Sequence, residues 1–363
     1  MPKKSKKLNN KKFLISFIIT LTTCFVFVGG LYALVSRFIS EPDIPTYVIF
    51  QFPDDRPNGP DNPDTPASIV VDDDNIGEFL SGEPEVRTEI FERRPGFFTF
   101  ILYGMDEGVN LDSIMVASFD SHNREVNIIS LPRDTRVESN RRTGQSKLVA
   151  AYAFGRLQGR GHEGGINQLK TEVSTLIGFR PDFYIGVELE AFIRIIDGLG
   201  GVEVTVPFHM RYTDPYQNLR IDIPAGTQRL NGIQASHFAR FRMADSGFRA
   251  VTDFQRVEHQ QMILSAIMQE MLSPRTITQI PEFIRIYNDH VTTNIPNDEM
   301  AWFGTNVVLN GINSINTYTL PIARTERSGW YEMPDREAIL ELVNRTINPF
   351  EREITAEMLR IVS

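Results

Sequence analysis

The chain has 363 residues and a formal net charge of −9. Because nucleic-acid-binding surfaces are basic, this acidic balance argues against nucleic acid as a partner. The single cysteine, Cys24, excludes an intramolecular disulfide bond.

The N-terminus has the pattern of a membrane anchor. Six lysines precede residues 13–36, a run without any charged residue. Such a run spans a hydrocarbon core of ~30 Å at a helical rise of ~1.5 Å per residue. Lysines on the N-terminal side hold that end in the cytoplasm. A cleaved signal peptide would have a shorter apolar region and an Ala-x-Ala-like site, so an uncleaved anchor is favoured. The sequence therefore predicts a single-pass protein of the cell membrane, with a cytoplasmic basic tail over residues 1–12.

An acidic, proline-rich segment follows the anchor. Residues 41–83 contain eleven Asp and Glu, seven prolines and only one basic residue, Arg56. Segments of this composition bury too little apolar surface to offset their chain entropy. We therefore expect an extended extracytoplasmic linker over residues 37–83, a folded domain over 84–350 and a C-terminal tail over 351–363.

Strands and helices are predicted to alternate within the folded domain. Residues 98–104, 113–119 and 125–131 are rich in β-branched and aromatic residues, and a turn at 120–123 pairs the last two antiparallel. Helices are expected over 147–154, 166–177, 189–199 and 252–272, with strands over 183–187 and 202–206. This alternation predicts an α/β fold, a layered α-β-α domain with a mixed central sheet.

Several familiar catalytic patterns are missing from the sequence. It contains no His-Glu-x-x-His pattern, no Gly-x-Ser-x-Gly elbow and no Gly-x-x-x-x-Gly-Lys phosphate loop. Catalysis by zinc, by an activated serine or by nucleotide hydrolysis is therefore disfavoured.

Two carboxylates stand at adjoining strand ends. Asp106 follows the first predicted strand, and Asp112 precedes the second. Together they could share a hard divalent cation such as magnesium. The alternative is that both only shape a turn, a position that Asp favours.

Arginines lie at the ends of other elements. Arg133 follows the third predicted strand, Arg240 and Arg242 follow a helix-like segment, and Arg256 lies early in the next helix. Arginine presents a planar fork of donors that matches phosphate oxygens. Beside a magnesium site, several such forks would hold a diphosphate. The alternative is a solvated basic face with ordinary ion pairs.

These segments occur in the order seen in a known family. The chain resembles LytR-CpsA-Psr proteins in seven ordered motifs: Asp112-Ser113-Ile114-Met115, Ile129-Ser130-Leu131-Pro132-Arg133-Asp134-Thr135, Lys147-Leu148-Val149-Ala150-Ala151-Tyr152-Ala153, Asp197-Gly198-Leu199-Gly200-Gly201-Val202, Leu230-Asn231-Gly232-Ile233-Gln234-Ala235, Arg240-Phe241-Arg242 and Asp253-Phe254-Gln255-Arg256-Val257-Glu258-His259-Gln260-Gln261. Each motif alone is weak, but seven in order over residues 98 to about 272 are strong.

The resemblance implies a magnesium-dependent phosphotransferase of cell-wall assembly. Such enzymes move a glycopolymer, of the teichoic acid or capsular-polysaccharide type, from a polyprenyl-diphosphate carrier in the membrane lipid to peptidoglycan. It also implies an apolar tunnel for the lipid chain. The implied metal ligands are Asp106 and Asp112, the implied catalytic residues Asp112, Arg133, Arg240 and Arg242, and the implied substrate-binding residues Lys147, Asp253, Arg256 and Gln260. Asp112 is the first candidate for a general base.

The chain departs from the family at two positions. Asn110 and His259 stand where the family usually has arginine. This leaves open a second hypothesis, a catalytically weak, membrane-anchored glycopolymer-binding or regulatory protein of the cell envelope. A transcription regulator is disfavoured, because about a dozen cytoplasmic residues are too few for a DNA-binding module.

Overall fold

The computed structural model describes residues 39–52, 67–70, 87–105, 111–139, 141, 146–216, 219–271, 283, 285–286 and 289–362. No helix in these ranges is long and apolar enough to cross a bilayer, and the predicted anchor at 13–36 lies outside them. The chain divides into two compact units. The smaller contains Ile295–Asn306 and residues up to Asp43, and in it Ser40 donates a hydrogen bond to Asp298 near the start of helix α9 (Asn297–Asn310).

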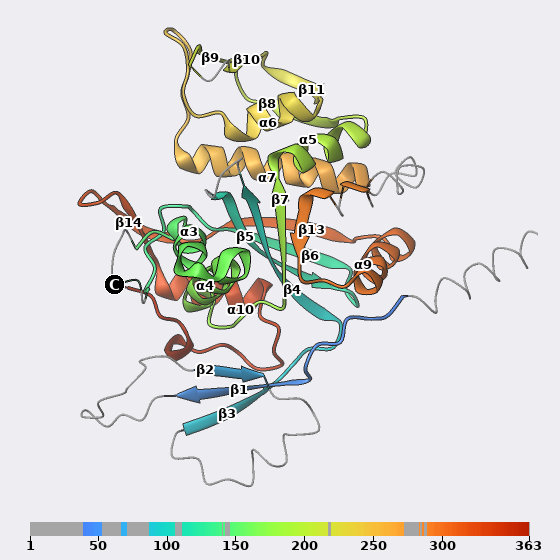
Figure 1. Ribbon diagram of the computed structural model, residues 1–363, viewed down its shortest axis with the longest axis vertical. Helices are drawn as coiled ribbons and strands as arrows, with labels where there is room; N and C mark the ends of the chain where they lie inside the picture. The colour runs from blue at the N-terminus through green and yellow to red at the C-terminus, as the bar shows by residue number, and fades with distance from the viewer. Residues whose placement is uncertain are drawn as a thin grey trace, which may run out of the picture. The chain divides into compact units, whose positions relative to one another are not determined.

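A six-stranded mixed sheet forms the centre of the larger unit (Figure 1). Its strand order is β12-β7-β4-β5-β6-β13, with β7 parallel to β4 and β13 parallel to β6. The other three pairs are antiparallel, including the predicted β5–β6 pair. The predicted α/β fold with a mixed central sheet is therefore confirmed. Its strands are β4 (Phe97–Met105), β5 (Leu111–Asp120), β6 (Glu125–Ser130), β7 (Phe183–Glu188), β12 (Val291–Thr293) and β13 (Ser314–Thr319).

Helices α3 (Ala150–Gly155), α4 (Gly161–Ile177) and α10 (Arg336–Thr346) pack on one face of this sheet, and the short helix η3 (Arg156–Arg160) joins the first two. Ile101, Val116 and Ile129 point from the strands into this core. Alternate residues such as Ala117 and Ile128 are buried as well, so both faces of the sheet are covered. The expected C-terminal tail also joins the core through Leu359 and Ile361, next to the turn η5 (Ala356–Met358).

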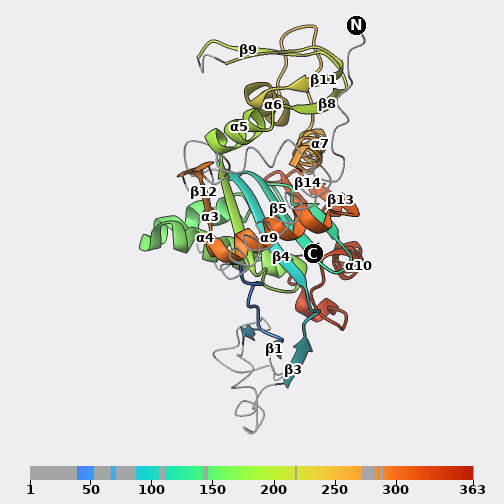
Figure 2. The ribbon, with the colours of Figure 1, turned by 90° about the vertical axis from the view of Figure 1, so that its right-hand side faces the viewer.

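A second hydrophobic core lies beside one end of the sheet. It is built from α5 (Leu189–Gly198), β8 (Val202–Val206), β9 (Met210–Asp214), β10 (Leu219–Ile223), β11 (Gly226–Leu230), α6 (Gly232–Arg240) and α7 (Asp253–Met271). β8 pairs with β11 and β9 with β10. Along β8 the valines are buried while Glu203 and Thr205 are exposed, the pattern of a one-sided strand. Figures 1 and 2 both show α7 between the other elements of this group and the central sheet.

The predicted linker is partly folded, which corrects the expectation of an extended segment. β1 (Tyr47–Phe52) pairs with β2 (Ala67–Val70) and with β3 (Arg87–Glu92) in an antiparallel sheet. The Phe50 ring lies edge-on to Phe91 at 4.9 Å and to Phe350 at 5.7 Å, inside the main core. The average composition of residues 41–83 hid this apolar hexapeptide. The domain limits at 84 and 350 stay predictions.

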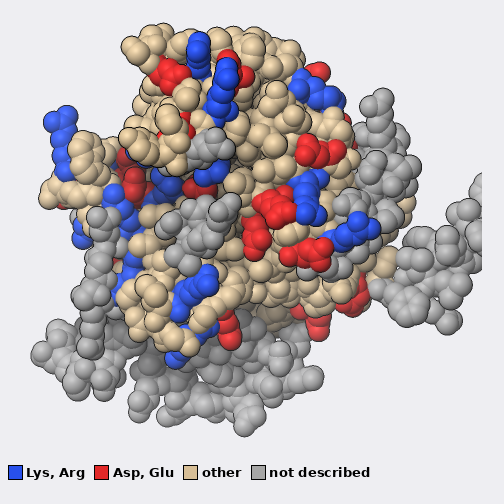
Figure 3. All heavy atoms as spheres, turned by 45° about the horizontal axis from the view of Figure 1, so that its top comes forward, with Lys and Arg blue, Asp and Glu red and all other residues tan. Residues whose placement is uncertain are grey.

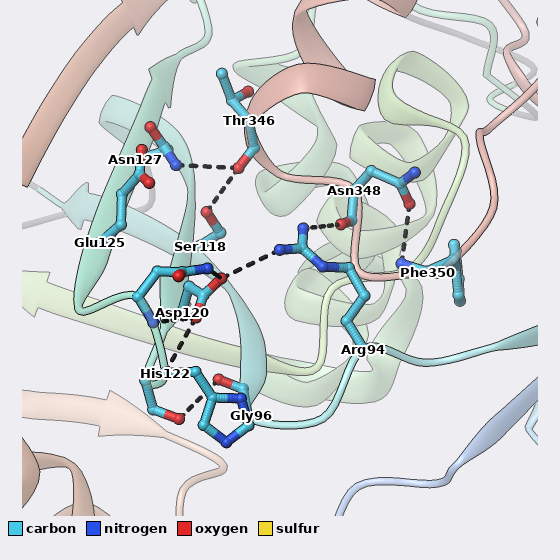
Figure 4. A network of polar contacts seen from close by, with 12 residues as sticks. Arg94, Gly96, Ser118, Asp120, His122, Glu125, Asn127, Thr346, Asn348 and Phe350 are labelled. Carbon is cyan, nitrogen blue, oxygen red and sulfur yellow. Dashed lines mark hydrogen bonds and ion pairs between the residues drawn. The ribbon is translucent and has the colours of Figure 1, made fainter.

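Polar side chains form a network at the end of β5 (Figure 4). Asp120 accepts hydrogen bonds from Arg94 Nη2 at 3.1 Å, from the backbone N–H of His122 at 3.1 Å and from Asn123 N and Nδ2, both at 2.8 Å. Arg94 also donates to the Asn348 carbonyl at 3.3 Å. This network fixes the turn between β5 and β6 against the segment that follows α10.

Candidate functional site

The opposite end of β5 presents a different carboxylate, Asp112. Continuing the β5–β6 register past Met115 and Ser130 brings Arg133 opposite Asp112. Arg133 Nη1 lies 3.8 Å from Asp112 Oδ1. Two local features hold Arg133 there, since Pro132 ends the strand and Thr135 closes a turn on its carbonyl oxygen with both N–H and hydroxyl, at 3.0 and 2.7 Å.

A second guanidinium reaches Asp112 from α6. The helix begins with a capping box in which Asn231 and Gln234 bond each other's backbone N–H, and Arg240 is its last residue. Arg240 Nε lies 3.5 Å from Asp112 Oδ2. Asp112 therefore has one guanidinium at each carboxylate oxygen.

The distances from Asp112 to Arg133 and Arg240 are too long for tight hydrogen bonds, so the polar groups of this trio remain available to a ligand. Charge-assisted hydrogen bonds between nitrogen and oxygen are ~2.7–2.9 Å long, shorter than both distances here. The Asp112 and Arg133 side chains are 33% and 25% exposed, and Arg240 is 48% exposed. Arg133 Nε is buried without a hydrogen-bond partner in the described part of the chain. The arrangement can bind an anion without first breaking a tight ion pair.

Lys147 adds a further positive charge beside the site, where it forms an ion pair with Asp134. Its Nζ lies 3.0 Å from Asp134 Oδ1 and 5.6 Å from the centre of the Tyr331 ring. The Arg136 guanidinium lies over the same ring at 4.7 Å. Both contacts to the ring have cation–π geometry, which fixes the cations beside the turn.

Tyr331 belongs to a hairpin from the far end of the chain, formed by β14 (Ile322–Glu326) and β15 (Tyr331–Pro334). Glu332 N–H donates to the Asp134 carbonyl at 2.9 Å, and Arg136 N–H donates to the Glu332 carbonyl at 2.9 Å. The hairpin thus adds a short strand to the segment that carries Arg133 and Asp134.

A buried ion pair ties the same segment to α4. Arg141 Nη2 donates to Glu172 Oε2 at 2.9 Å and to the Lys147 carbonyl at 3.1 Å, and Arg141 Nε lies 2.9 Å from Glu172 Oε1 in an ion pair. Ser139 and Gln168 donate to the same carboxylate at 2.7 and 2.8 Å. Burial raises the pKa of Glu172, and the hydrogen bonds from Ser139, Gln168 and Arg141, together with the Arg141 charge, oppose that rise. These contacts fix the position of Lys147, three residues before α3 begins at Ala150.

Helix α7 brings further predicted residues to this end of the sheet. Arg256 is buried and Gln260 is half-buried, while the Arg242 side chain in the preceding loop is exposed. His259 is buried against Phe238, with ring centres 4.6 Å apart, and burial lowers its pKa to about 4. The Asp253 side chain lies outside the described residues, as do Asp106 and Asn110.

The structure therefore brings Asp112, Arg133 and Arg240 together. It does not test whether Asp106 and Asp112 form the predicted pair of magnesium ligands. In the described ranges no group of three His, Cys, Asp or Glu side chains could hold a metal ion. Asp106, the second predicted ligand, is outside those ranges, so magnesium stays a prediction. On the face drawn in Figure 3, basic and acidic side chains are interspersed, unlike an extended basic surface for nucleic acid.

Comparisons with known proteins agree with the family resemblance found in the sequence. A family model described as the LytR_cpsA_psr family matches residues 83–348. The regulatory protein MsrR of Staphylococcus aureus is 28% identical over 234 residues, which cover 63% of this chain and 66% of MsrR. The polyisoprenyl-teichoic acid–peptidoglycan teichoic acid transferase TagV of Bacillus subtilis is 29% identical over 219 residues, covering 58% of this chain and 53% of TagV.

The fold comparison agrees with the family match. The crystal structure of Bacillus subtilis TagV superposes with a TM-score of 0.55 at 26% identity, covering 69% of this chain and 95% of the TagV chain. The chain spans slightly less than two thirds of the length of MsrR and about half that of TagV in the sequence matches.

Proposed function

Because this chain belongs to the LytR-CpsA-Psr family, we propose that it is a phosphotransferase of the cell envelope. It moves a glycopolymer from a polyprenyl-diphosphate carrier to peptidoglycan and forms a phosphodiester. TagV is named a teichoic acid transferase, which supports this reaction with a cargo of the teichoic acid type, and the proposal includes capsular polysaccharide as the second type of cargo. The observation that carries the proposal is the pair of guanidiniums, Arg133 and Arg240, at the two oxygens of Asp112.

The proposed reaction uses the trio as follows. A peptidoglycan hydroxyl attacks the phosphorus nearer the cargo and forms the new P–O bond. The bond from that phosphorus to the bridging oxygen breaks, and the lipid leaves as its monophosphate. Arg133 and Arg240 bind the diphosphate and neutralise the charge that develops on the leaving lipid phosphate. Asp112 accepts the proton of the attacking hydroxyl.

Other predicted residues border the same site in this proposal. Arg242 is proposed to bind the diphosphate with Arg133 and Arg240, and the proposed substrate-binding residues around them are Lys147, Asp253, Arg256 and Gln260. The position of Lys147 in the ion pair with Asp134 supports its part, because it places a positive charge beside the Arg133 turn.

Magnesium is the proposed cofactor, with Asp106 and Asp112 as its ligands. Asp112 fits this role, since carboxylate oxygens are the preferred ligands of a hard cation and its own two oxygens are not in tight hydrogen bonds with either arginine. When bound, the ion supplies further neutralisation of phosphate charge.

The proposed location is the cell membrane, with residues 13–36 as a single-pass anchor and the folded domain outside. The basic residues before this apolar run support that orientation. A carrier lipid that never leaves the bilayer requires an enzyme that stays beside it.

The test is turnover of a polyprenyl-diphosphate saccharide by the full-length protein in detergent with magnesium. We expect release of lipid monophosphate, and a loss of about 100-fold or more in Arg133→Ala, because one charged donor to the transition state is removed. Arg194→Ala, an exposed arginine paired with Glu190 on α5, is the matched control and keeps full turnover.

Absence of turnover by the unmutated protein on several polyprenyl diphosphates would overturn the enzyme proposal. It would favour the second hypothesis, an envelope-anchored glycopolymer-binding or regulatory protein, the class in which MsrR is named.

A further inference from the structure

A groove of about 400 Å³ runs along α7, separate from the arginines. One wall is a single face of the helix, the other is β8, and Thr317 of β13 contributes to its base. We call it the α7 groove. The residues used below are Glu203, Thr205, Glu258, Gln261, Ser265 and Gln269.

The lining of the α7 groove is polar but not basic. Two carboxylates, two amides and three hydroxyls face it, and Lys, Arg and His are missing from its described lining. A phosphate-rich polymer would meet the carboxylates of Glu203 and Glu258 without a compensating cation. Hydroxyl and amide N–H groups of a sugar would instead find acceptors, and Met262 and Ala266 offer apolar contact for the carbon faces of a ring.

Gln261 supplies a fixed acceptor in this groove. Its Nε2 lies 2.8 Å from the Tyr318 carbonyl, 3.0 Å from Ser130 Oγ and 3.2 Å from Thr319 Oγ1. Because a carbonyl oxygen only accepts, the amide nitrogen must face Tyr318. The amide oxygen is thereby turned the other way, and it has no hydrogen-bond partner among the residues described.

The same contact connects the groove to the reacting end of the sheet. Ser130 is the last residue of β6, three positions before Arg133. From Glu258 to Gln269 the groove follows α7 for about 16 Å at the helical rise. That length holds a short oligosaccharide, and the Gln261–Ser130 contact places it beside the strand that leads to Arg133.

We propose that the α7 groove binds the acceptor glycan, a chain of N-acetylated amino sugars, while the arginines bind the donor diphosphate. This rests on the proposed function and assigns its second substrate to a place. The two substrates are separated by charge, since the acceptor is bound by carboxylates, amides and hydroxyls and the donor by guanidiniums.

The test uses full-length protein in detergent and, as the probe, a soluble oligosaccharide of alternating N-acetylglucosamine and N-acetylmuramic acid whose lactyl carboxyl groups are capped as amides and therefore carry no charge. Two variants address the groove: Glu258→Ala removes an exposed acceptor, and Ser265→Tyr adds bulk. In each, we expect the acceptor KM to rise about ten-fold, as for the loss of one hydrogen bond to the ligand. Both variants should hydrolyse the donor without acceptor at the unmutated rate. The control Glu341→Ala changes an exposed glutamate on α10 and should leave both the acceptor KM and donor hydrolysis unchanged.

Binding of the same oligosaccharide, measured by titration calorimetry without donor, keeps the test independent of turnover. If the unmutated protein lacks turnover but its oligosaccharide binding is weakened by both groove variants, the reaction is wrong and the groove assignment stands. If both variants bind and use the oligosaccharide as the unmutated protein does, the groove assignment is overturned. Weakened binding of a glycerol-phosphate oligomer instead would also overturn it.

Discussion

The two ends of β5 carry one aspartate each, and they differ in what surrounds them. Asp112 and Asp120 are eight residues apart, about 27 Å along the strand. The Asp120 side chain is 10% exposed and accepts four hydrogen bonds of 2.8–3.1 Å (Figure 4). Asp112 is 33% exposed and has two guanidiniums at 3.5 and 3.8 Å. A carboxylate whose acceptors are filled by its own chain stabilises the fold, whereas one left open in a cationic setting is suited to a ligand.

The Arg93–Asp182 pair belongs to the first kind. Arg93 Nη1 and Nη2 donate to the two Asp182 oxygens at 2.7 and 2.8 Å, and the hydroxyl and N–H of Thr99 donate to the second oxygen at 2.6 and 2.9 Å. Close, bidentate geometry of this kind is absent at Asp112. The contrast therefore separates structural from functional ion pairs within one protein.

The largest expected effect that tests this contrast comes from Asp112→Asn. Removing the charge between two arginines should lower turnover about 100- to 1000-fold while the melting temperature stays within experimental error. Lipid monophosphate release and thermal unfolding measure the two quantities. Asp222→Asn, an exposed carboxylate on β10 paired with His209, is the control and should keep both. A large loss of stability in Asp112→Asn would instead assign Asp112 to the structural class.

The next effect concerns His259, a buried polar group whose Nδ1 has no partner in the described chain. Burial lowers its pKa from 6.5 to about 4, so the unfolded chain binds a proton more readily than the folded one. The stability that the folded protein gains from holding His259 neutral is fully present above pH 6.5 and is lost as the pH falls toward 4. We expect the free energy of unfolding to fall by up to about 3 kcal/mol from this group over that window.

The measurement is urea unfolding at several pH values for the unmutated protein and His259→Leu. The difference between the two curves isolates the histidine from carboxylates that also titrate there. Parallel curves over pH 4–6.5 would contradict the prediction.

A smaller effect is expected at the structural end of β5. Asp120→Ala leaves the donors of Arg94, His122 and Asn123 without their acceptor and should lower the free energy of unfolding by about 2 kcal/mol. Turnover per folded molecule should not change. Denaturant unfolding and active-site-normalised rates measure these, and a loss of turnover without a loss of stability would reverse the contrast.

The smallest expected effect is that of Arg240→Lys. The charge is kept, but the planar fork that matches phosphate oxygens is lost, so turnover should fall about ten-fold. Arg194→Lys on α5 should have no effect. Equal turnover in Arg240→Lys and the unmutated protein would mean that Arg240 acts as a charge alone.

Local patterns in the sequence were sufficient to predict much of the central sheet and part of the candidate site. The alternation in residues 98–131 predicts β4, β5 and β6, and antiparallel pairing then brings Arg133 to Asp112. The approach of Arg240 to the same carboxylate depends on how the second core packs, and only the family resemblance pointed to it. The strands β9, β10 and β11 were missed, although the strict alternation of apolar and polar residues over Leu219–Ile223 is a signal that could have indicated β10.

Two other features had no local signal. Tyr331 borders the site from almost 200 positions beyond Arg133, and no spacing rule connects the two. β1 lies within an acidic, proline-rich stretch whose average composition resembles an unfolded segment. In both cases the deciding interaction is tertiary, with the Tyr331 ring against Arg136 and Lys147 and the Phe50 ring against Phe91 and Phe350.

The hairpin that carries Tyr331 also imposes an order in time. The turn that presents Arg133 is completed only when Glu332 pairs with Asp134 and Arg136. During synthesis those two partners are made long before Glu332, and a contact of such high sequence separation forms late in folding. A growing chain in which Glu332 has not yet been made therefore lacks the finished turn at Arg133. The site proposed here is therefore complete only after the β14–β15 hairpin has been synthesised and has folded onto this turn.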